Sequence, residues 1–328
     1  MTFTNVIGHG SIAQQLEYTY QQDRIPSAYL FIGLEGIGKS TLVKAFAQMM
    51  NCQTHDNCHR CDSCRMFDNG NHPDFHVIKP DGQSIRIKQI HDLIRHLDLK
   101  PAYAVKRLVL VKEAHKLNLE SANSFLKILE EPPLNTLIIL MTTDENLLLE
   151  TINSRCQKIY FSPLTSEDLR ILLDRNYQLD PATLDFVLSY AQGRIRKGFI
   201  EKATILANMR IQVLHMLKTL KTEKLYDYSL LIDQWVKQNL HPFFLEFCMA
   251  WLRDLLSVRR QSPMGVINSD MMDELEDVST CFSDEILQWS FDLVVETELA
   301  IQSNASKNLA LESLLIQMKQ IFWGTLVV

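Results

Sequence analysis

The chain has 328 residues, of which 46% are hydrophobic and 22% are charged. This composition is typical of a globular protein and excludes a disordered or collagen-like chain, and the length predicts two or three domains. The formal net charge of −6 argues against a protein that coats nucleic acid through bulk positive charge.

Charge is distributed unevenly along the chain. Residues 261–328 contain two basic and eleven acidic residues, a net charge of −9, whereas the first 260 residues carry a net charge of +3. We therefore expect any contact with nucleic acid to involve the earlier part of the chain. We see no secretory signal at the N-terminus and no apolar run long enough to span a bilayer, so we expect a cytoplasmic protein without a membrane partner.

Five short apolar runs in the first half of the chain are typical of buried strands. They span residues 28–32, 75–78, 108–111, 137–141 and 158–161. Helical stretches lie between several of them. This alternation predicts an α/β domain with a largely parallel sheet and helices on both faces.

A glycine-rich loop follows the first of these runs. Residues 33–40 read GLEGIGKS, which matches the phosphate-loop motif G-x-x-x-x-G-K-[ST] and precedes a helical stretch that begins near Thr41. Gly33, Gly36 and Gly38 allow backbone N–H groups to surround phosphates. Lys39 is expected to reach the outer phosphates, and Ser40 to ligate Mg²⁺. Thr41, the next residue, is also expected to belong to the nucleotide-binding set. The alternative is an ordinary strand-to-helix turn.

The third run is followed by a departure from the usual nucleotide-binding pattern. A carboxylate that holds Mg²⁺ is expected after this strand, but Lys112 stands there and only Glu113 remains. A cation at this position repels Mg²⁺ at close range. ATP binding remains compatible with the intact loop, whereas hydrolysis by this chain is expected to be weak or absent. The alternative is that the loop is a structural relic.

Four of the seven cysteines fall within thirteen residues. Cys52, Cys58, Cys61 and Cys64 give the spacing C-x5-C-x2-C-x2-C, which predicts a structural Zn²⁺ site with four thiolates in a reducing compartment. His55 and His59 are close enough to substitute as ligands. Among the remaining cysteines, Cys248 and Cys281 are expected to be buried core thiols.

The rest of the chain is expected to be helical. Thr165 is placed to cap a helix with an acidic first turn, Asp180-Pro181 to begin another, and Gly193 to end one. From about residue 206 onward, the chain is rich in Leu, Met and Gln and is expected to be helical throughout.

Several segments together resemble clamp-loader subunits of bacterial DNA polymerase III, which belong to the AAA+ class. They are RIPSAYLF at 24–31, the phosphate loop, the cysteine cluster, NHPD at 71–74, IRIKQI at 85–90, ANSFLKILEEPP at 122–133, SRC at 154–156 and NLALE at 308–312. LEEPP with a downstream SRC is specific to this family in combination.

The resemblance implies a domain organisation and a set of partners. It implies an AAA+ nucleotide-binding domain with a RecA-like parallel sheet at 1–162, into which a zinc module at 52–64 is inserted. A helical lid at 163–205 and an all-α collar for oligomerisation at 206–328 follow. The implied partners are gamma/tau and delta subunits in a hetero-oligomeric ring, the sliding clamp, and primed DNA through the assembled complex.

The resemblance also implies roles for single residues. Arg155 of SRC is expected to act in trans as an arginine finger at the ATP site of a neighbouring subunit, although alone it would be interpreted as a salt-bridge residue. Thr142 or Thr143 occupies the sensor 1 position beside the nucleotide. Arg196, with Arg194 as its neighbour, resembles the sensor 2 arginine.

Two subunit types of this family share the plan. Lys112 and the chain length favour the delta prime type over the gamma/tau motor, in which the metal and hydrolysis carboxylates are intact. The motor type, or another autonomous AAA+ ATPase, remains the alternative. A zinc-dependent reader of nucleic acid is disfavoured, because no basic or aromatic stripe flanks the cysteines.

Overall fold

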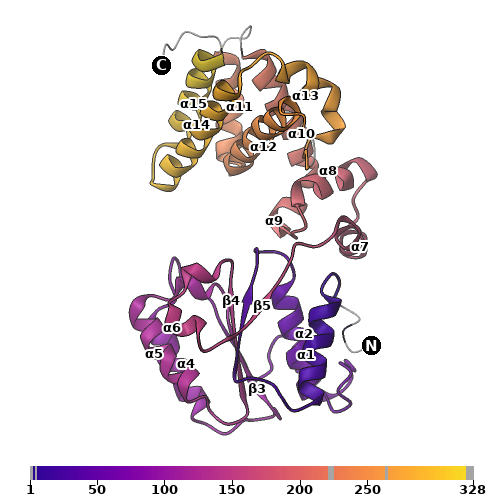
Figure 1. Cartoon of the computed structure of the whole chain (residues 1–328), viewed down its shortest axis with the longest axis vertical. Coiled ribbons are helices and arrows are strands. Elements are labelled where there is room, and N and C mark those ends of the chain that lie inside the picture. The colour runs from indigo at the N-terminus through magenta and orange to yellow at the C-terminus, as the bar shows by residue number, and fades with distance from the viewer. Residues whose placement is uncertain (1–2, 4–5, 221–224, 263–264, 323–328) are drawn as a thin grey trace. The chain divides into compact units, whose positions relative to one another are not determined.

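The structure is a computed structural model that describes residues 3, 6–220, 225–262 and 265–322 (Figure 1). The chain divides into two compact units, of which the first comprises Met1–Leu179 with Ala191–Arg196. The second comprises Asp180–Tyr190 with Lys197–Val328. The predicted three-part division with boundaries at residues 162 and 205 stays a prediction.

The first unit is built on a five-stranded parallel sheet. The strands are β1 (Ala28–Ile32), β2 (Phe75–Ile78), β3 (Arg107–Val111), β4 (Thr136–Thr142) and β5 (Gln157–Tyr160). Their spatial order is β2-β3-β4-β1-β5, and every neighbouring pair is parallel. All five predicted strands are confirmed to within one residue at either end: β3 begins one residue earlier, β4 extends one residue further at both ends, and β5 lies one residue earlier than expected.

Helices cover both faces of this sheet, as predicted (Figure 1). On one face lie α1 (Gly10–Gln21), α2 (Lys39–Asn51) and α3 (Asp62–Asp68), and on the other lie α4 (Ile87–Leu97), α5 (Leu119–Glu130) and α6 (Glu150–Asn153). Alternate strand residues contribute to the two apolar cores. Tyr29 and Phe31 point toward the first core and Leu30 toward the second, because successive side chains of a strand project to opposite faces.

The predicted helix starts after the sheet are also confirmed. The short helices η1 (Ala114–Lys116) and η2 (Glu145–Leu147) precede α7 (Ser166–Asn176) and α8 (Pro181–Ala191). The Thr165 hydroxyl accepts a hydrogen bond from the backbone N–H of Asp168 at 3.1 Å, and Asp180 accepts one from the N–H of Thr183 at 3.0 Å. Both side chains satisfy donors that a helix start leaves unpaired.

The second unit is helical in its described residues. Besides α8 it contains α9 (Lys197–Ile200), α10 (Ala203–Thr219), α11 (Leu225–Lys237), α12 (His241–Arg259), η3 (Ser269–Met271), α13 (Met272–Ser279), α14 (Asp284–Gln302) and α15 (Lys307–Phe322). Helix α12 packs against α10, α13 and α14, and α15 packs against α11 and α14. None of the helices in the described part of the chain combines the length and apolar character needed to cross a membrane.

A buried polar network holds α8, α10 and α12 together within this unit. The fully buried carboxylate of Asp254 accepts hydrogen bonds from the backbone and side-chain N–H groups of Asn268, both at 2.8 Å. The Asn268 carbonyl in turn accepts the Tyr190 hydroxyl at 2.7 Å. Arg210 stacks over the Phe186 ring and binds Asp270. These partners account for buried polar groups that would otherwise be costly.

One of the two predicted core cysteines is not buried. Cys248 lies on α12 and is completely buried, whereas Cys281 is exposed. The prediction for Cys281 was wrong because α13 ends at Ser279, which places Cys281 in the turn before α14. The next residue, Phe282, occupies the buried position of that turn.

Candidate functional site

The loop between β1 and α2 carries the predicted phosphate-binding motif. β1 is buried along its whole length, and α2 begins at Lys39 with Gly38 as its N-cap. Gly36 has a φ of +83°, which residues with a side chain rarely adopt. A Cβ atom at Gly36 would lie 2.6 Å from the carbonyl oxygen of Ile195. The loop therefore has the strand-to-helix context of a phosphate site, and it requires glycine at position 36.

A cavity of about 550 Å³ opens beside this loop. Its walls come from the start of α2 and from the segments that follow β3 and β4, together with Ile195. The lining residues are Glu35, Gly36, Gly38, Lys39, Ser40, Thr41, Lys112, Glu113, His115, Lys116, Met141, Thr142, Thr143 and Ile195. The carboxyl ends of parallel strands meet at one sheet edge, where ligands of α/β proteins commonly bind. All predicted nucleotide-binding residues except Gly33 and Arg196 thus line one cavity.

The ammonium group of Lys39 is buried within the loop. Its Nζ donates hydrogen bonds to the carbonyl oxygens of Gly33 and Leu34, the latter at 2.6 Å. Burial lowers the pKa of Lys39 to about 8, and the nearby Glu35 carboxylate partly opposes this shift. The cation is thus held by the backbone at the cavity wall, next to where α2 begins.

The two threonines at the end of β4 are placed differently. Thr142 is buried, and its hydroxyl donates to the carbonyl oxygen of Asp144 at 2.7 Å while lying 3.3 Å from Nδ1 of His115. Thr143 is exposed and lines the cavity. The Thr142 hydroxyl is thus engaged in ending the strand, whereas Thr143 is the more accessible of the two.

The segment after β3 brings more positive than negative charge to the cavity. Glu113 has a φ of +50°, and its carboxylate pairs with Lys116 at 2.6 Å. Lys112 is half-buried. Among the described residues, its ammonium group has no hydrogen-bond or ion-pair partner. The sequence departure at Lys112 therefore leaves an unpaired cation in the cavity wall.

Residues 191–196 return to the first unit beside the phosphate loop. The backbone N–H of Ile195 donates to the carbonyl oxygen of Gly36 at 2.8 Å, which ties this segment to the loop. Arg194 and Arg196 are half-buried, and neither lines the cavity. The sensor 2 role of Arg196 stays a prediction.

Arg155 lies away from this cavity, in the turn between α6 and β5. Its side chain is 36% exposed, and its guanidinium group pairs with Glu130 at 2.8 Å. It also donates to the carbonyl oxygen of Thr151 at 2.9 Å. Glu130 belongs to the LEEPP segment at the end of α5. The structure therefore brings together the two family motifs that stand 25 residues apart in the sequence.

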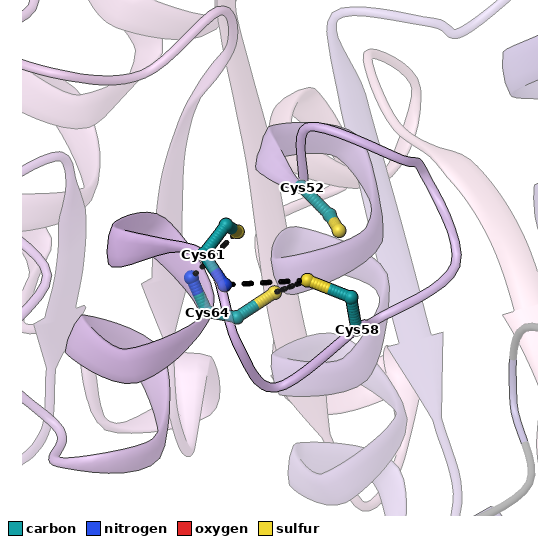
Figure 2. A group of neighbouring side chains, drawn as sticks. All are labelled: Cys52, Cys58, Cys61 and Cys64. Carbon is teal, nitrogen blue, oxygen red and sulfur yellow. Dashed lines mark hydrogen bonds between the residues drawn. The ribbon is translucent and has the colours of Figure 1, made fainter.

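The four clustered cysteines form a compact group (Figure 2). Cys52 directly follows α2, Cys64 lies on α3, and the other two lie in the connecting loop. Their sulfur atoms all lie within 4.8 Å of one another, and those of Cys58 and Cys64 are 3.9 Å apart. Tetrahedral Zn²⁺ with Zn–S bonds of about 2.3 Å would separate its sulfur ligands by about 3.8 Å. The donor set and its geometry fit this ion.

Backbone N–H groups reach two of these sulfur atoms. Sγ of Cys58 accepts from the N–H of Cys61 at 3.4 Å, and Sγ of Cys61 accepts from the N–H of Cys64 at 3.5 Å. The N–H of Cys61 lowers the pKa of the Cys58 thiol, whereas burial raises the pKa of Cys64. Such N–H···S bonds stabilise thiolates, the form that binds metal.

The neighbouring histidines have other partners. Nδ1 of His55 lies 3.3 Å from the Tyr20 hydroxyl, and Nδ1 of His59 lies 2.9 Å from Asp68. The cluster identified by geometry contains the four cysteines alone. A set of four sulfur donors leaves no open coordination position, which is the arrangement of a structural site.

Comparison with known proteins shows a similarity to subunits of DNA polymerase III. A family model described as "DNA polymerase III, delta subunit" matches residues 8–165. DNA polymerase III subunit delta' of Bacillus subtilis is 26% identical over 317 residues, covering 94% of this chain and 95% of that protein. The chain is thus similar to a DNA polymerase III delta' subunit over nearly its whole length, and to the family model over residues 8–165.

Tau subunits of DNA polymerase III match over less of their length. The tau subunit of Bacillus subtilis is 26% identical over 83% of this chain and 53% of that protein. The tau subunit of Escherichia coli is 32% identical over 60% of this chain and 31% of that protein. The chain thus spans about half or less of these tau subunits, whereas the match to the delta' subunit covers 95% of that protein.

Asp74 has a structural role that the sequence did not indicate, because the sequence drew attention to it only as part of the NHPD segment. The buried carboxylate of Asp74 accepts hydrogen bonds from the N–H groups of Ala102, Tyr103 and Ala104 at 3.0, 2.7 and 2.7 Å. These bonds fold the loop that leads into β3. The signal available in the sequence was an aspartate directly before an apolar run, but its partners lie about 30 residues away.

Proposed function

We propose that this chain is the delta prime subunit of a DNA polymerase III clamp loader. The observation that carries the proposal is the match to a delta' subunit over 94% of this chain and 95% of that protein. In this role the chain joins gamma/tau and delta subunits in a hetero-oligomeric ring in the cytoplasm. The ring loads the sliding clamp onto primed DNA at the expense of ATP.

The two units suit a division of labour of this kind. The first unit is the AAA+ nucleotide-binding domain, and its cavity at the phosphate loop is the nucleotide site. Residues 163–205 act as the helical lid, and residues 206–328 act as the collar through which subunits associate. The helical character and the buried apolar core of the second unit support a separately folded collar.

Arg155 serves catalysis at the ATP site of a neighbouring motor subunit. Its guanidinium group stabilises the charge that develops on the transferring phosphoryl group, as an arginine supplied in trans does in other phosphoryl-transfer systems. Its exposed position, away from the chain's own cavity, supports this role. Glu130 holds the side chain by an ion pair until the neighbour is in place.

Zn²⁺ held by Cys52, Cys58, Cys61 and Cys64 is structural. The ion joins the end of α2 to α3 and so fixes the insertion that precedes β2. The geometry of the four sulfur atoms supports this assignment.

Assembly with the partner subunits tests the proposal. The purified chain is mixed with gamma/tau and delta subunits of the same source, and the mixture is separated by size-exclusion chromatography. We expect all three to co-elute and to load the sliding clamp onto primed DNA, whereas omission of this chain abolishes loading. A complex of unchanged composition and activity without this chain would contradict the proposal.

Substitution of Arg155 tests its role within that complex. We expect Arg155→Ala to leave assembly intact and to lower DNA-stimulated ATP hydrolysis at the adjacent site by about 10³-fold. Arg95→Ala is the matched control, because Arg95 is also an exposed arginine that pairs with an acidic residue. Equal rates for the two variants would remove Arg155 from the chemistry.

A further inference from the structure

The phosphate-loop cavity lacks a normal set of ligands for Mg²⁺. Such a site holds the ion with the hydroxyl that follows the loop lysine and a carboxylate after a neighbouring strand. Ser40 supplies the hydroxyl. The residue that directly follows β3, where the carboxylate is expected, is Lys112. The carboxylate of the next residue, Glu113, forms an ion pair with Lys116 at 2.6 Å. The residues present therefore do not fit Mg²⁺.

Charge in the cavity wall points to an anionic ligand without a metal. Three lysines, at positions 39, 112 and 116, face two glutamates, at positions 35 and 113. The carboxylate of Glu113 forms an ion pair with Lys116, and the carboxylate of Glu35 interacts electrostatically with Lys39. Lys112 is left without a partner among the described residues. A divalent cation would add positive charge beside it and would be repelled.

The lysine stands in the same wall as the phosphate loop. β3 and β1 flank β4 in the parallel sheet, so the segments that follow all three strands meet at one edge. Lys112 directly follows Val111, the last residue of β3, and lines the cavity together with Ser40 and Lys39. A phosphate group bound by the loop N–H groups would therefore lie in the same cavity as Lys112.

We propose that Lys112 takes the place of Mg²⁺, so that the cavity binds the polyphosphate of a nucleotide in its metal-free form. The ammonium group neutralises phosphate oxygens that a metal ion neutralises elsewhere. Lys112 cannot hold or polarise the two oxygens of an in-line displacement as a metal ion does, and the bound nucleotide is therefore retained without being hydrolysed. This inference rests on the nucleotide site of the proposed function and specifies the form in which the nucleotide binds there. It does not bear on assembly of the loader.

Equilibrium binding of ATP and ADP to the purified chain tests the inference. Titrations are done by calorimetry, once with EDTA and once with Mg²⁺ in excess over nucleotide. We expect binding with EDTA to be at least as tight as binding with Mg²⁺. Binding by the unmodified chain that requires Mg²⁺ would overturn the inference, and so would failure to bind in either condition. Neither result would affect co-elution with partner subunits, which tests the proposed function separately.

Variants of Lys112 make the test specific. We expect Lys112→Ala to weaken binding in EDTA by about tenfold or more, the loss of one charge-assisted hydrogen bond. Lys112→Asp is expected to weaken binding further in EDTA and to make it depend on Mg²⁺. Unchanged affinity of Lys112→Ala in EDTA would overturn the inference.

Two further variants serve as controls. Lys88→Ala removes an exposed lysine of α4 that does not line the cavity, and it is expected to bind as the unmodified chain does. Lys39→Ala is expected to lose binding in both conditions, which locates the nucleotide at the phosphate loop. Melting curves of all variants establish that the first unit remains folded. An equal loss of affinity in Lys88→Ala and Lys112→Ala would overturn the inference.

Discussion

The two ends of α2 carry two candidate ligand sites that differ in how many of the expected ligand groups are present. At its start, the phosphate loop and its cavity keep the backbone cradle and Lys39 but lack the carboxylate that holds Mg²⁺. At its end, the cysteine cluster has four sulfur donors at distances that suit one metal ion. A helix of 13 residues is about 20 Å long, so the two sites share an element without sharing atoms.

The two sites differ in what each needs from the sequence. A backbone cradle depends on glycines and on a strand-to-helix turn, and both remain here. Metal-dependent hydrolysis also needs a carboxylate that holds Mg²⁺ after a neighbouring strand, and Lys112 stands at that position here. The cysteine cluster differs, because a tetrahedral metal ion needs all four sulfur atoms, one at each coordination position.

Removal of one cysteine is expected to have the largest effect. Cys64→Ser removes a buried thiol of the cluster, and from the proposed zinc site we expect loss of zinc binding together with destabilisation of the first unit by more than about 3 kcal/mol. Metal analysis and thermal unfolding measure the two effects. Cys281→Ser, at an exposed cysteine outside the cluster, is the matched control. Full zinc content in Cys64→Ser would show that the cluster is not the site.

The next largest effect is expected at Asp74, which follows the cysteine module. Asp74→Asn weakens an acceptor of three backbone N–H groups, and we expect a loss of about 3 kcal/mol in the free energy of unfolding. Denaturant unfolding measures it. Asp92→Asn, at a partly exposed carboxylate on α4, is the control and is expected to cost less than about 1 kcal/mol. Equal losses of stability in Asp74→Asn and Asp92→Asn would mean that the buried hydrogen bonds of Asp74 contribute no more than the exposed ion pair of Asp92.

The same carboxylate predicts a dependence of stability on pH. Burial raises the pKa of Asp74, but the N–H groups of Tyr103, Ala102 and Ala104 outweigh it, so the pKa lies below the ordinary value. The stabilisation is therefore fully present above the ordinary aspartate pKa and is lost as the pH falls through the folded-state pKa. Unfolding measured across the acidic range should show a smaller decline for Asp74→Asn than for the unmodified chain.

The phosphate loop and the cysteine cluster are expected to bind their ligands independently, although both adjoin α2. We expect Lys39→Ala to retain zinc in full, and Cys64→Ser to retain affinity for ATP within about threefold, since sites without shared partners act additively. Metal analysis of the first variant and calorimetry of the second check this. Loss of nucleotide binding in Cys64→Ser, while the protein remains folded, would show that α2 couples its two ends.

The smallest effect is expected at Glu130. The ion pair with Arg155 is partly exposed, with 50% of the Glu130 side chain accessible, and such pairs contribute about 0–1 kcal/mol. Glu130→Ala is therefore expected to leave stability nearly unchanged in thermal unfolding. A loss above about 2 kcal/mol would indicate a structural role for the pair and would weaken the case for a free arginine finger.

Much of the first unit could be predicted from the sequence because local signals determine it. Apolar runs indicated all five strands, and the glycine-rich motif indicated the turn at residues 33–40. Spacing alone indicated the cysteine cluster, since three of its members are separated by two residues each. The cap at Thr165, like the cap at Asp180 in the second unit, followed from the same kind of local chemistry.

The remaining features depend on contacts between distant segments. The bonds from Asp74 to residues 102–104, the pairing of Arg155 with Glu130, and the contact of Gly36 with Ile195 join residues between 25 and about 160 positions apart. No periodicity or motif encodes such partners. Cys281 was misjudged for a related reason, because the end of α13 decides which of two neighbouring residues is buried.

Steady-state ATP hydrolysis by the purified chain alone, with Mg²⁺ present, is the most direct measurement. A subunit that binds nucleotide through Lys39 and Lys112 and serves catalysis only through Arg155 is expected to show no turnover above that of its Lys39→Ala variant. Turnover that Lys39→Ala abolishes would contradict this account and would identify the chain as a motor subunit of the loader.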